Sequence, residues 1–85
     1  MSWIEENGSL VRTFKTPDFL TAYNLVSAVV EPAEGLKHHP DITFGWGYVR
    51  ITLTTHDVGD ITDLDRRLAR LIDEAVKSLD IQTFN

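Results

Sequence analysis

Residues 41–56, DITFGWGYVRITLTTH, constrain the fold more than any other stretch of the sequence. β-Branched residues are dense in the second half, where apolar and polar residues alternate as they do in a half-buried strand. The apolar residues form two sets around Gly-Trp-Gly-Tyr, each with its own parity: Ile42, Phe44 and Trp46 in the first strand and turn, and Val49, Ile51 and Leu53 in the second strand. The stretch therefore predicts two antiparallel strands joined by a turn near Trp46 and Gly47.

A second hairpin is predicted in the first 14 residues. WIEE and SLVRTF flank the dipeptide Asn7-Gly8. Both residues accept positive φ angles, which the type I′ turn of a two-residue hairpin requires.

A helix is predicted between the two hairpins, in residues 16–36. Thr16 is the expected N-cap and Pro17 the first helical residue. Proline lacks an N–H and clashes with the preceding turn, so Pro32 predicts that the helix kinks or ends near residues 29–31. The expected buried stripe consists of residues at helical spacing: Phe19, Tyr23, Val26, Val30 and Ala33.

Residues 61–79, ITDLDRRLARLIDEAVKSL, predict a second helix. Thr62 and Asp65 have the spacing of a capping box at its start. Its expected buried stripe is Leu64, Leu68, Leu71, Ile72, Ala75 and Leu79. The order ββαββα then favours an α+β fold, in which a four-stranded antiparallel sheet carries two helices on one face.

The length of 85 residues predicts a single domain, residues 1–85, with a small core. Because the chain has no cysteine to form disulfides, oligomerisation is the expected extra source of stability. The net charge of −5 argues against binding of nucleic acid, which needs a basic face. With no signal peptide and no apolar run long enough for a membrane span, we expect a cytoplasmic protein without membrane contact.

The three histidines of the chain are predicted to meet. His38 and His39 lie in LKHHPDI, and His56 lies in TTHDVGD. A turn near residues 46–47 sets residue 44 opposite about 49, and extending that ladder sets residue 38 opposite about 55. All three imidazoles should therefore gather at one end of the sheet.

Three interpretations of such a cluster are open on the residues alone. Three histidines can form an open zinc site, although adjacent histidines diverge on an extended backbone. They can also merely cap loops and strand ends. General acid–base chemistry is the third, because imidazole gives or takes a proton near neutral pH.

Two carboxylates are candidates to accompany the histidines. Glu34 precedes His38 by four residues, and Asp65 opens the last helix. Each also has a plain structural interpretation, Glu34 as a surface residue and Asp65 as part of the capping box. The functional alternative is a carboxylate that orients a histidine through a hydrogen bond.

The combination of these motifs resembles the pterin-4a-carbinolamine dehydratases. It consists of E-x-x-x-H-H-P-D, a second motif T-H-D whose histidine follows His39 by 17 residues, and an aspartate at the start of an LARLID helix. The likeness runs from about Phe14 to Ile72. It implies an enzyme that dehydrates 4a-hydroxytetrahydropterins to quinonoid dihydropterins without metal or cofactor, typically as a homodimer or homotetramer.

The resemblance also implies roles for individual residues. His38, His39 and His56 match the family's active-site imidazoles, and Glu34 and Asp65 match its acidic positions, which we expect to bind substrate. Our hypothesis is that His38 and His56 form the acid–base pair while His39 positions the pterin.

Two other functions stay open beside the enzyme. Some family members are also transcriptional cofactors, so the chain could be a non-enzymatic dimerisation module on the same scaffold. The second open alternative is a zinc hydrolase. The chain departs from the family pattern in starting almost at its first strand, in Ile42 where tryptophan is frequent, in Asp60 where glycine is usual, and in Pro32.

Overall fold

A computed structural model of the chain describes residues 3–79. The elements are β1 (Ile4–Glu6), β2 (Ser9–Lys15), α1 (Phe19–Leu36), β3 (Asp41–Gly45), β4 (Tyr48–Leu53) and α2 (Asp63–Ser78). This order confirms the predicted ββαββα arrangement and the α+β class.

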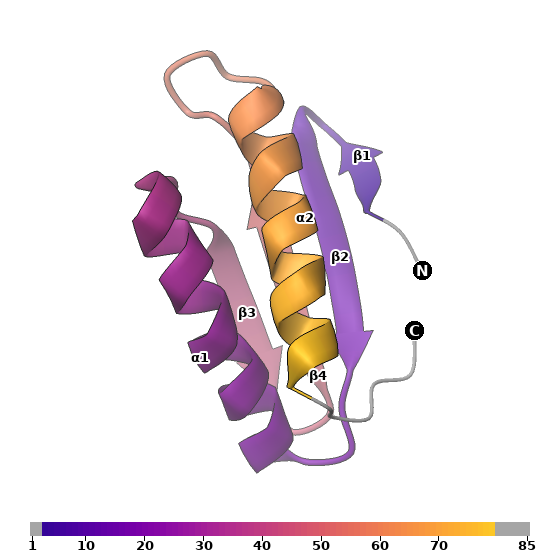
Figure 1. Cartoon of the computed structure of the whole chain (residues 1–85). Helices are drawn as coiled ribbons and strands as arrows, with labels where there is room; N and C mark the ends of the chain where they lie inside the picture. Colours follow the sequence, from indigo (N-terminus) through magenta and orange to yellow (C-terminus); the bar gives the residue numbers. More distant parts are fainter. Residues whose placement is uncertain (1–2, 80–85) are drawn as a thin grey trace.

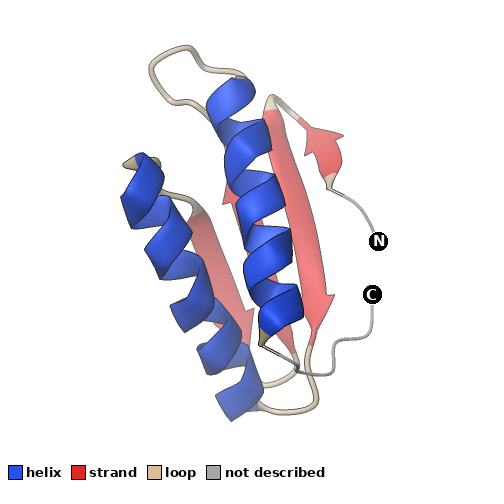
Figure 2. Cartoon of the chain, in the orientation of Figure 1, coloured by secondary structure: helices blue, strands red, loops and turns tan. Residues whose placement is uncertain are grey.

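The four strands form one antiparallel sheet in the order β1-β2-β4-β3. Figure 1 shows α1 and α2 side by side on the same face of this sheet, and Figure 2 shows the two layers by colour. The core lies between the layers and includes the fully buried Leu25, Ile51 and Leu68.

Both predicted hairpins are confirmed. Asn7 and Gly8 have φ of 52° and 77°, the positive values that the type I′ turn requires. In the second hairpin Phe44 pairs with Val49, as the parity of the apolar residues predicts. This ladder ends where Asp41 pairs with Thr52, so the histidine segments leave the sheet at the same end.

The predicted start of α1 is wrong by about two residues. The N-cap is Asp18, whose side chain accepts a hydrogen bond from the Thr21 N–H at 2.8 Å. Thr16 is instead buried, and its hydroxyl donates to the Asp18 carbonyl at 3.2 Å. Pro17 therefore lies before the helix.

Of the two effects predicted for Pro32, a kink or an early end, the end near residues 29–31 is wrong, since the helix continues through Pro32 to Leu36. A proline inside a helix costs one hydrogen bond and a steric clash, about 3 kcal/mol. Val29 and Ala33, on either side of Pro32, are buried against the rest of the core. Burial of this part of the helix outweighs the local cost of the proline.

The buried face of α1 differs from the predicted stripe. The side chains that α1 buries fully are Ala22, Leu25, Val29 and Ala33. Of the predicted stripe, Ala33 is buried and Val26 is partly buried against the core. Phe19, Tyr23 and Val30 are more than half exposed. Apolar residues occupy two neighbouring faces of this helix, and the face with two alanines is the one that packs into the core.

The predicted N-terminus of α2 is confirmed, with Thr62 as N-cap. Its buried stripe is Asp65, Leu68, Ala69, Ile72 and Val76. Leu68 and Ile72 were predicted, whereas Leu64 and Leu71 are more than a third exposed. A carboxylate, Asp65, takes the place in the core that the pattern assigned to leucine. Within residues 3–79 neither helix combines the length and the apolar character needed to cross a bilayer.

Candidate active site

A hollow of about 330 Å³ lies at the end of the sheet where β4 leads toward α2. Its lining combines the end of α1 with the loop after β4: Lys37, His38, His39, Thr54, Thr55, His56, Asp57 and Leu64. The three histidines therefore line one hollow, as the hairpin register predicts.

The C-terminus of α1 delivers His38 to this hollow. Lys37 adopts the left-handed conformation with φ of 52°. The Lys37 N–H donates to the Glu34 carbonyl and the His38 N–H donates to the Ala33 carbonyl, each at 3.1 Å. These two bonds form a Schellman motif, which reverses the chain at a defined residue. The position of His38 is thus set by backbone bonds as well as by its side chain.

The His38 side chain is paired with Asp65. Its Nε2 lies 2.5 Å from Oδ1 of Asp65, across the 27 residues that separate them. Only 12% of the His38 side chain is exposed, and the Asp65 side chain is fully buried. A buried carboxylate holding an imidazole in this way sets the orientation of the ring.

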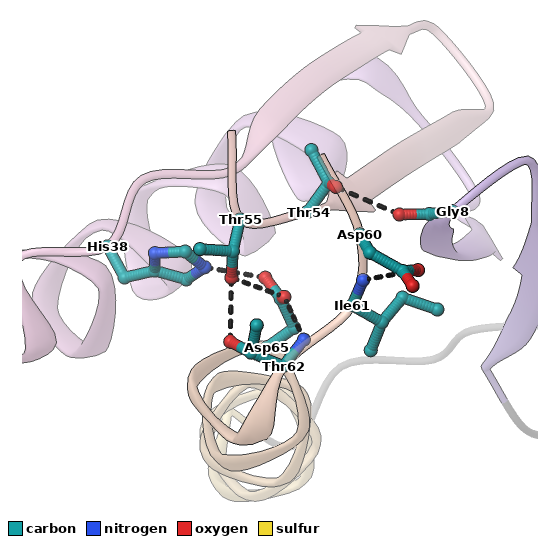
Figure 3. Close-up of polar contacts among 8 residues, drawn as sticks. All are labelled: Gly8, His38, Thr54, Thr55, Asp60, Ile61, Thr62 and Asp65. Carbon is teal, nitrogen blue, oxygen red and sulfur yellow. Dashed lines mark hydrogen bonds and ion pairs between the residues drawn. The ribbon is translucent and has the colours of Figure 1, made fainter. Parts of the chain in front are cut away.

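The second oxygen of Asp65 is also occupied, as Figure 3 shows. Oδ2 accepts a hydrogen bond from the Thr55 hydroxyl at 2.8 Å and another from the Thr62 N–H at 2.9 Å. The hydroxyl oxygens of Thr55 and Thr62 lie 2.7 Å apart. Asp65 therefore serves both as the capping-box partner of Thr62 and as the partner of His38.

These contacts keep Asp65 ionised. Burial alone would raise the pKa of the Asp65 carboxyl. The hydrogen bond with His38, followed by those from the Thr62 N–H and the Thr55 hydroxyl, outweighs burial and lowers the pKa below its ordinary 3.8. At neutral pH the group behind His38 is a carboxylate.

His39 has a different environment from its neighbour. Its Nε2 lies 2.6 Å from Oε2 of Glu34, and the two side chains are 62% and 67% exposed. Of this pair, His39 lines the histidine hollow and Glu34 does not. His39 and Glu34 also border a second, more apolar hollow of about 220 Å³, whose other lining residues are Val29, Val30, Ala33, Pro40 and Ile42.

His56 reaches the hollow from the loop between β4 and α2 and is exposed. Backbone bonds shape this loop: the Thr55 N–H donates to the Asp60 carbonyl at 3.2 Å, and the Gly59 N–H donates to the Thr55 carbonyl at 2.8 Å. The Thr54 hydroxyl donates to the Gly8 carbonyl at 2.8 Å and ties the loop to the first hairpin. His56 therefore belongs to a loop that is held on both sides.

The sequence model of a known family, described as pterin 4 alpha carbinolamine dehydratase, matches residues 1–75. That span includes every residue of the histidine hollow and its carboxylates. The chain belongs to the pterin-4a-carbinolamine dehydratase family.

Curated relatives within this family are similar over most of their length. A candidate pterin-4-alpha-carbinolamine dehydratase of Metallosphaera sedula is 43% identical over 76 residues, which cover 89% of this chain and 79% of the relative. One of Chloroflexus aurantiacus is 46% identical over 72 residues, 85% of this chain and 77% of the relative.

Solved structures agree with this assignment. A protein described as a transcriptional coactivator/pterin dehydratase from Brucella melitensis has a TM-score of 0.79 and 31% identity, over 88% of this chain and 82% of its own. A pterin dehydratase-like protein described as a RuBisCO assembly factor in the alpha-carboxysome has a TM-score of 0.72 and 24% identity, over 89% and 90% of the two chains. The second likeness concerns the fold alone.

Two residues that contact Asp65, Thr55 and Thr62, were not among the site residues predicted from the sequence. Thr55 and Thr62 complete the surroundings of Asp65, but threonine is frequent at strand ends and helix N-caps for structural reasons alone. The available signal was spacing: Thr55 directly precedes His56, and Thr62 stands three residues before Asp65. Within residues 3–79, no three side chains of His, Cys, Asp or Glu are arranged to hold a metal ion.

Proposed function

We propose that this chain is a hydro-lyase that dehydrates 4a-hydroxytetrahydropterin to quinonoid dihydropterin and water. The observation that carries the proposal is the pair of His38 with the buried, ionised Asp65 in a hollow that His39 and His56 also line. Membership of the pterin-4a-carbinolamine dehydratase family supplies the substrate class.

The reaction needs two proton transfers. The bond from C4a to the hydroxyl oxygen breaks readily only when an acid protonates the departing oxygen, so that water leaves. A base must take up the proton that is lost from nitrogen as the new double bond forms. Positioned imidazoles can do both near neutral pH, and each transfer contributes about 10²–10⁴-fold to the rate.

His38 and His56 are our acid–base pair. They reach the hollow from different segments, His38 from the end of α1 and His56 from the loop after β4. A flat substrate between these segments would meet one imidazole from each. This arrangement suits a reaction that adds a proton at one atom and removes another elsewhere.

His39 and Glu34 are the proposed contacts that hold the pterin. Both side chains are exposed and both border the second, more apolar hollow, while His39 also lines the histidine hollow, so a ligand can reach them. Asp65, which the resemblance led us to expect as a substrate contact, acts in this proposal from behind His38, because it is fully buried and both of its oxygens already accept hydrogen bonds. The pterin ring is neutral and planar, so the net charge of −5 imposes no electrostatic penalty on its binding.

We further propose that the chain works as a homodimer or homotetramer. Several large apolar side chains lie exposed on α1, namely Phe19, Leu20, Tyr23 and Val30. Such side chains are typical of surfaces that meet another protein. Light scattering of the purified protein measures the assembly directly, and a monomer at micromolar concentration would contradict this part of the proposal.

Freshly prepared 4a-hydroxytetrahydropterin tests the activity. Formation of quinonoid dihydropterin is followed by absorbance with and without protein, and the protein should accelerate it well beyond the rate in buffer. No acceleration would contradict the proposal. Metal analysis of the same preparation separates the zinc alternative, since stoichiometric zinc that activity requires would replace the metal-free mechanism.

A further inference from the structure

We propose that the Thr55 hydroxyl is a positioning group that makes Nδ1, and not Nε2, the reacting nitrogen of His38. This inference rests on the proposed function, because it assigns a task within the same site. It concerns the hydrogen-bonded group of His38, Asp65, Thr55 and Thr62, which Figure 3 shows together.

The direction of the bond between His38 and Asp65 follows from the charge of the carboxylate. An ionised carboxylate can only accept hydrogen bonds. With Oδ1 at 2.5 Å, Nε2 of His38 must therefore carry the proton and donate it. In a neutral imidazole the other nitrogen, Nδ1, then carries the free electron pair.

The two threonine hydroxyls are ordered by the same reasoning. Each hydroxyl has one proton to donate. The proton of Thr55 is directed to Oδ2 of Asp65 at 2.8 Å, because the carboxylate cannot donate in return. The contact of 2.7 Å between the hydroxyls must then be a bond that Thr62 donates to Thr55. The result is a chain of donors that runs from Thr62 through Thr55 to Asp65.

This chain of donors fixes the rotation of the carboxylate. Oδ2 is held from two directions, by the Thr55 hydroxyl and by the Thr62 N–H at 2.9 Å. Oδ1 is then directed at His38. Without the Thr55 hydroxyl only the backbone N–H would hold Oδ2, and the carboxylate could turn away from the imidazole.

The assignment of Nδ1 gives His38 the role of base. Neutral His38 takes up the proton that the substrate nitrogen loses, at Nδ1, and becomes an imidazolium with both nitrogens protonated. The carboxylate of Asp65 stabilises the imidazolium as it forms. His56 is then the acid that protonates the departing hydroxyl, and a proton returned from His38 to His56 through solvent restores both residues.

The tautomer of His38 can be measured without substrate. In protein labelled with nitrogen-15, two-bond proton–nitrogen correlations show which ring nitrogen of a neutral histidine is protonated. We expect a single form of His38 in the wild type, protonated at Nε2. Protonation at Nδ1 in the neutral ring would overturn the inference.

Thr55→Val tests the hydroxyl itself, since valine has nearly the shape of threonine without its donor. We expect His38 of this variant to populate both tautomers, while Thr55→Ser restores the single form. Thr54→Val is the matched control, because the Thr54 hydroxyl donates to the Gly8 carbonyl while Thr55 supplies the hydroxyl on Asp65, so this variant should leave His38 unchanged. A single Nε2-protonated form in Thr55→Val would overturn the positioning role.

The kinetic expectation for Thr55→Val is a kcat lowered by about tenfold or more with KM little changed. Thr55→Ser should recover most of the loss, which a merely structural role of the side chain would not require. If Thr55→Val fails to fold, Thr55→Ala removes the same donor and takes its place in both measurements, with the same expected and contradicting results.

The two proposals fail in different ways. A wild-type protein with His38 protonated at Nε2 that does not accelerate dehydration would remove the proposed function. A wild-type protein that accelerates dehydration with His38 protonated at Nδ1 would keep the function and remove this inference.

Discussion

His38 and His39 are neighbours in sequence, yet their side chains have opposite environments. His38 is 12% exposed and pairs with a fully buried carboxylate, whereas His39 is 62% exposed and pairs with a carboxylate on the surface. Burial strengthens the first pair, and solvent screens the second. The ring of His38 is therefore fixed by a buried carboxylate, whereas the ring of His39 is open to solvent.

The exposed pair of Glu34 and His39 can be tested by substitution of the carboxylate. Glu34→Gln should change the free energy of unfolding by less than about 1 kcal/mol, because exposed ion pairs contribute little. It should raise KM for the pterin while kcat stays close to the wild-type value. Urea denaturation and steady-state kinetics measure the two effects, and a fall in kcat to the level of a His38 variant would contradict this role.

The buried carboxylate gives a prediction on pH. The pKa of Asp65 is lowered in the folded chain, so the unfolded chain binds more protons as the solution becomes acidic. Its contribution to stability is therefore complete above the unfolded pKa, about 3.8, and is lost as pH falls through the lowered folded pKa.

Urea denaturation of the wild type and of Asp65→Asn at a series of pH values measures this contribution. Asp65→Asn should be less stable near neutral pH, because a buried network loses its charge. Its stability should also fall less steeply than that of the wild type below about pH 4. Equal slopes for the two proteins would show that Asp65 is not the group responsible.

Helix α1 contains a proline, Pro32, which is unfavourable inside a helix, close to the end that leads into the histidine hollow. Pro32 lies inside the helix, four residues before Leu36, and the Schellman motif at Lys37 follows directly. Both features cost conformational energy, since proline removes a hydrogen bond and lysine is a poor residue for positive φ. The packing of Val29 and Ala33 holds this part of the helix in place.

Pro32→Ala should therefore stabilise the protein, by about 1–3 kcal/mol, because alanine restores the helical hydrogen bond and removes the clash. Urea denaturation measures the gain. Pro17→Ala is the matched control, since Pro17 precedes the N-cap and its replacement should bring no comparable gain. Destabilisation by Pro32→Ala would mean that the proline ring itself contributes more through packing than it costs.

The elements also show which parts of the fold the sequence could predict. Turn chemistry at Asn7-Gly8 and the alternation in residues 48–53 depend on neighbouring residues, and both predictions were confirmed. The buried face of α1 was not predicted correctly, because two neighbouring faces are both apolar. Only packing against the sheet decides between them, and Phe19 instead stacks on Phe44 at 5.5 Å between ring centroids.

For the whole molecule, the meeting of the three histidines could be predicted because it depends on topology. One turn position and antiparallel pairing were enough to place His38 and His56 at the same end of the sheet. The complete burial of Asp65 and its contact with the Thr55 hydroxyl could not be predicted, although the capping box with Thr62 was. These depend on the rotation of α2 against the sheet, which no local pattern specifies.

We propose that the histidine hollow dehydrates 4a-hydroxytetrahydropterin and that His38, held by Asp65, is one of its two proton-transfer groups. The rate of quinonoid dihydropterin formation tests this most directly, measured for the wild type, His38→Ala and Arg67→Ala. Arg67 is an exposed residue of α2 and does not line the hollow, so Arg67→Ala serves as the control.

We expect His38→Ala to lower the acceleration by about 10²-fold or more, since it removes one proton-transfer group. Arg67→Ala should stay within about twofold of the wild type, as surface substitutions usually do. Circular dichroism confirms that both variants are folded. Folded His38→Ala that accelerates the reaction as well as Arg67→Ala would contradict the account.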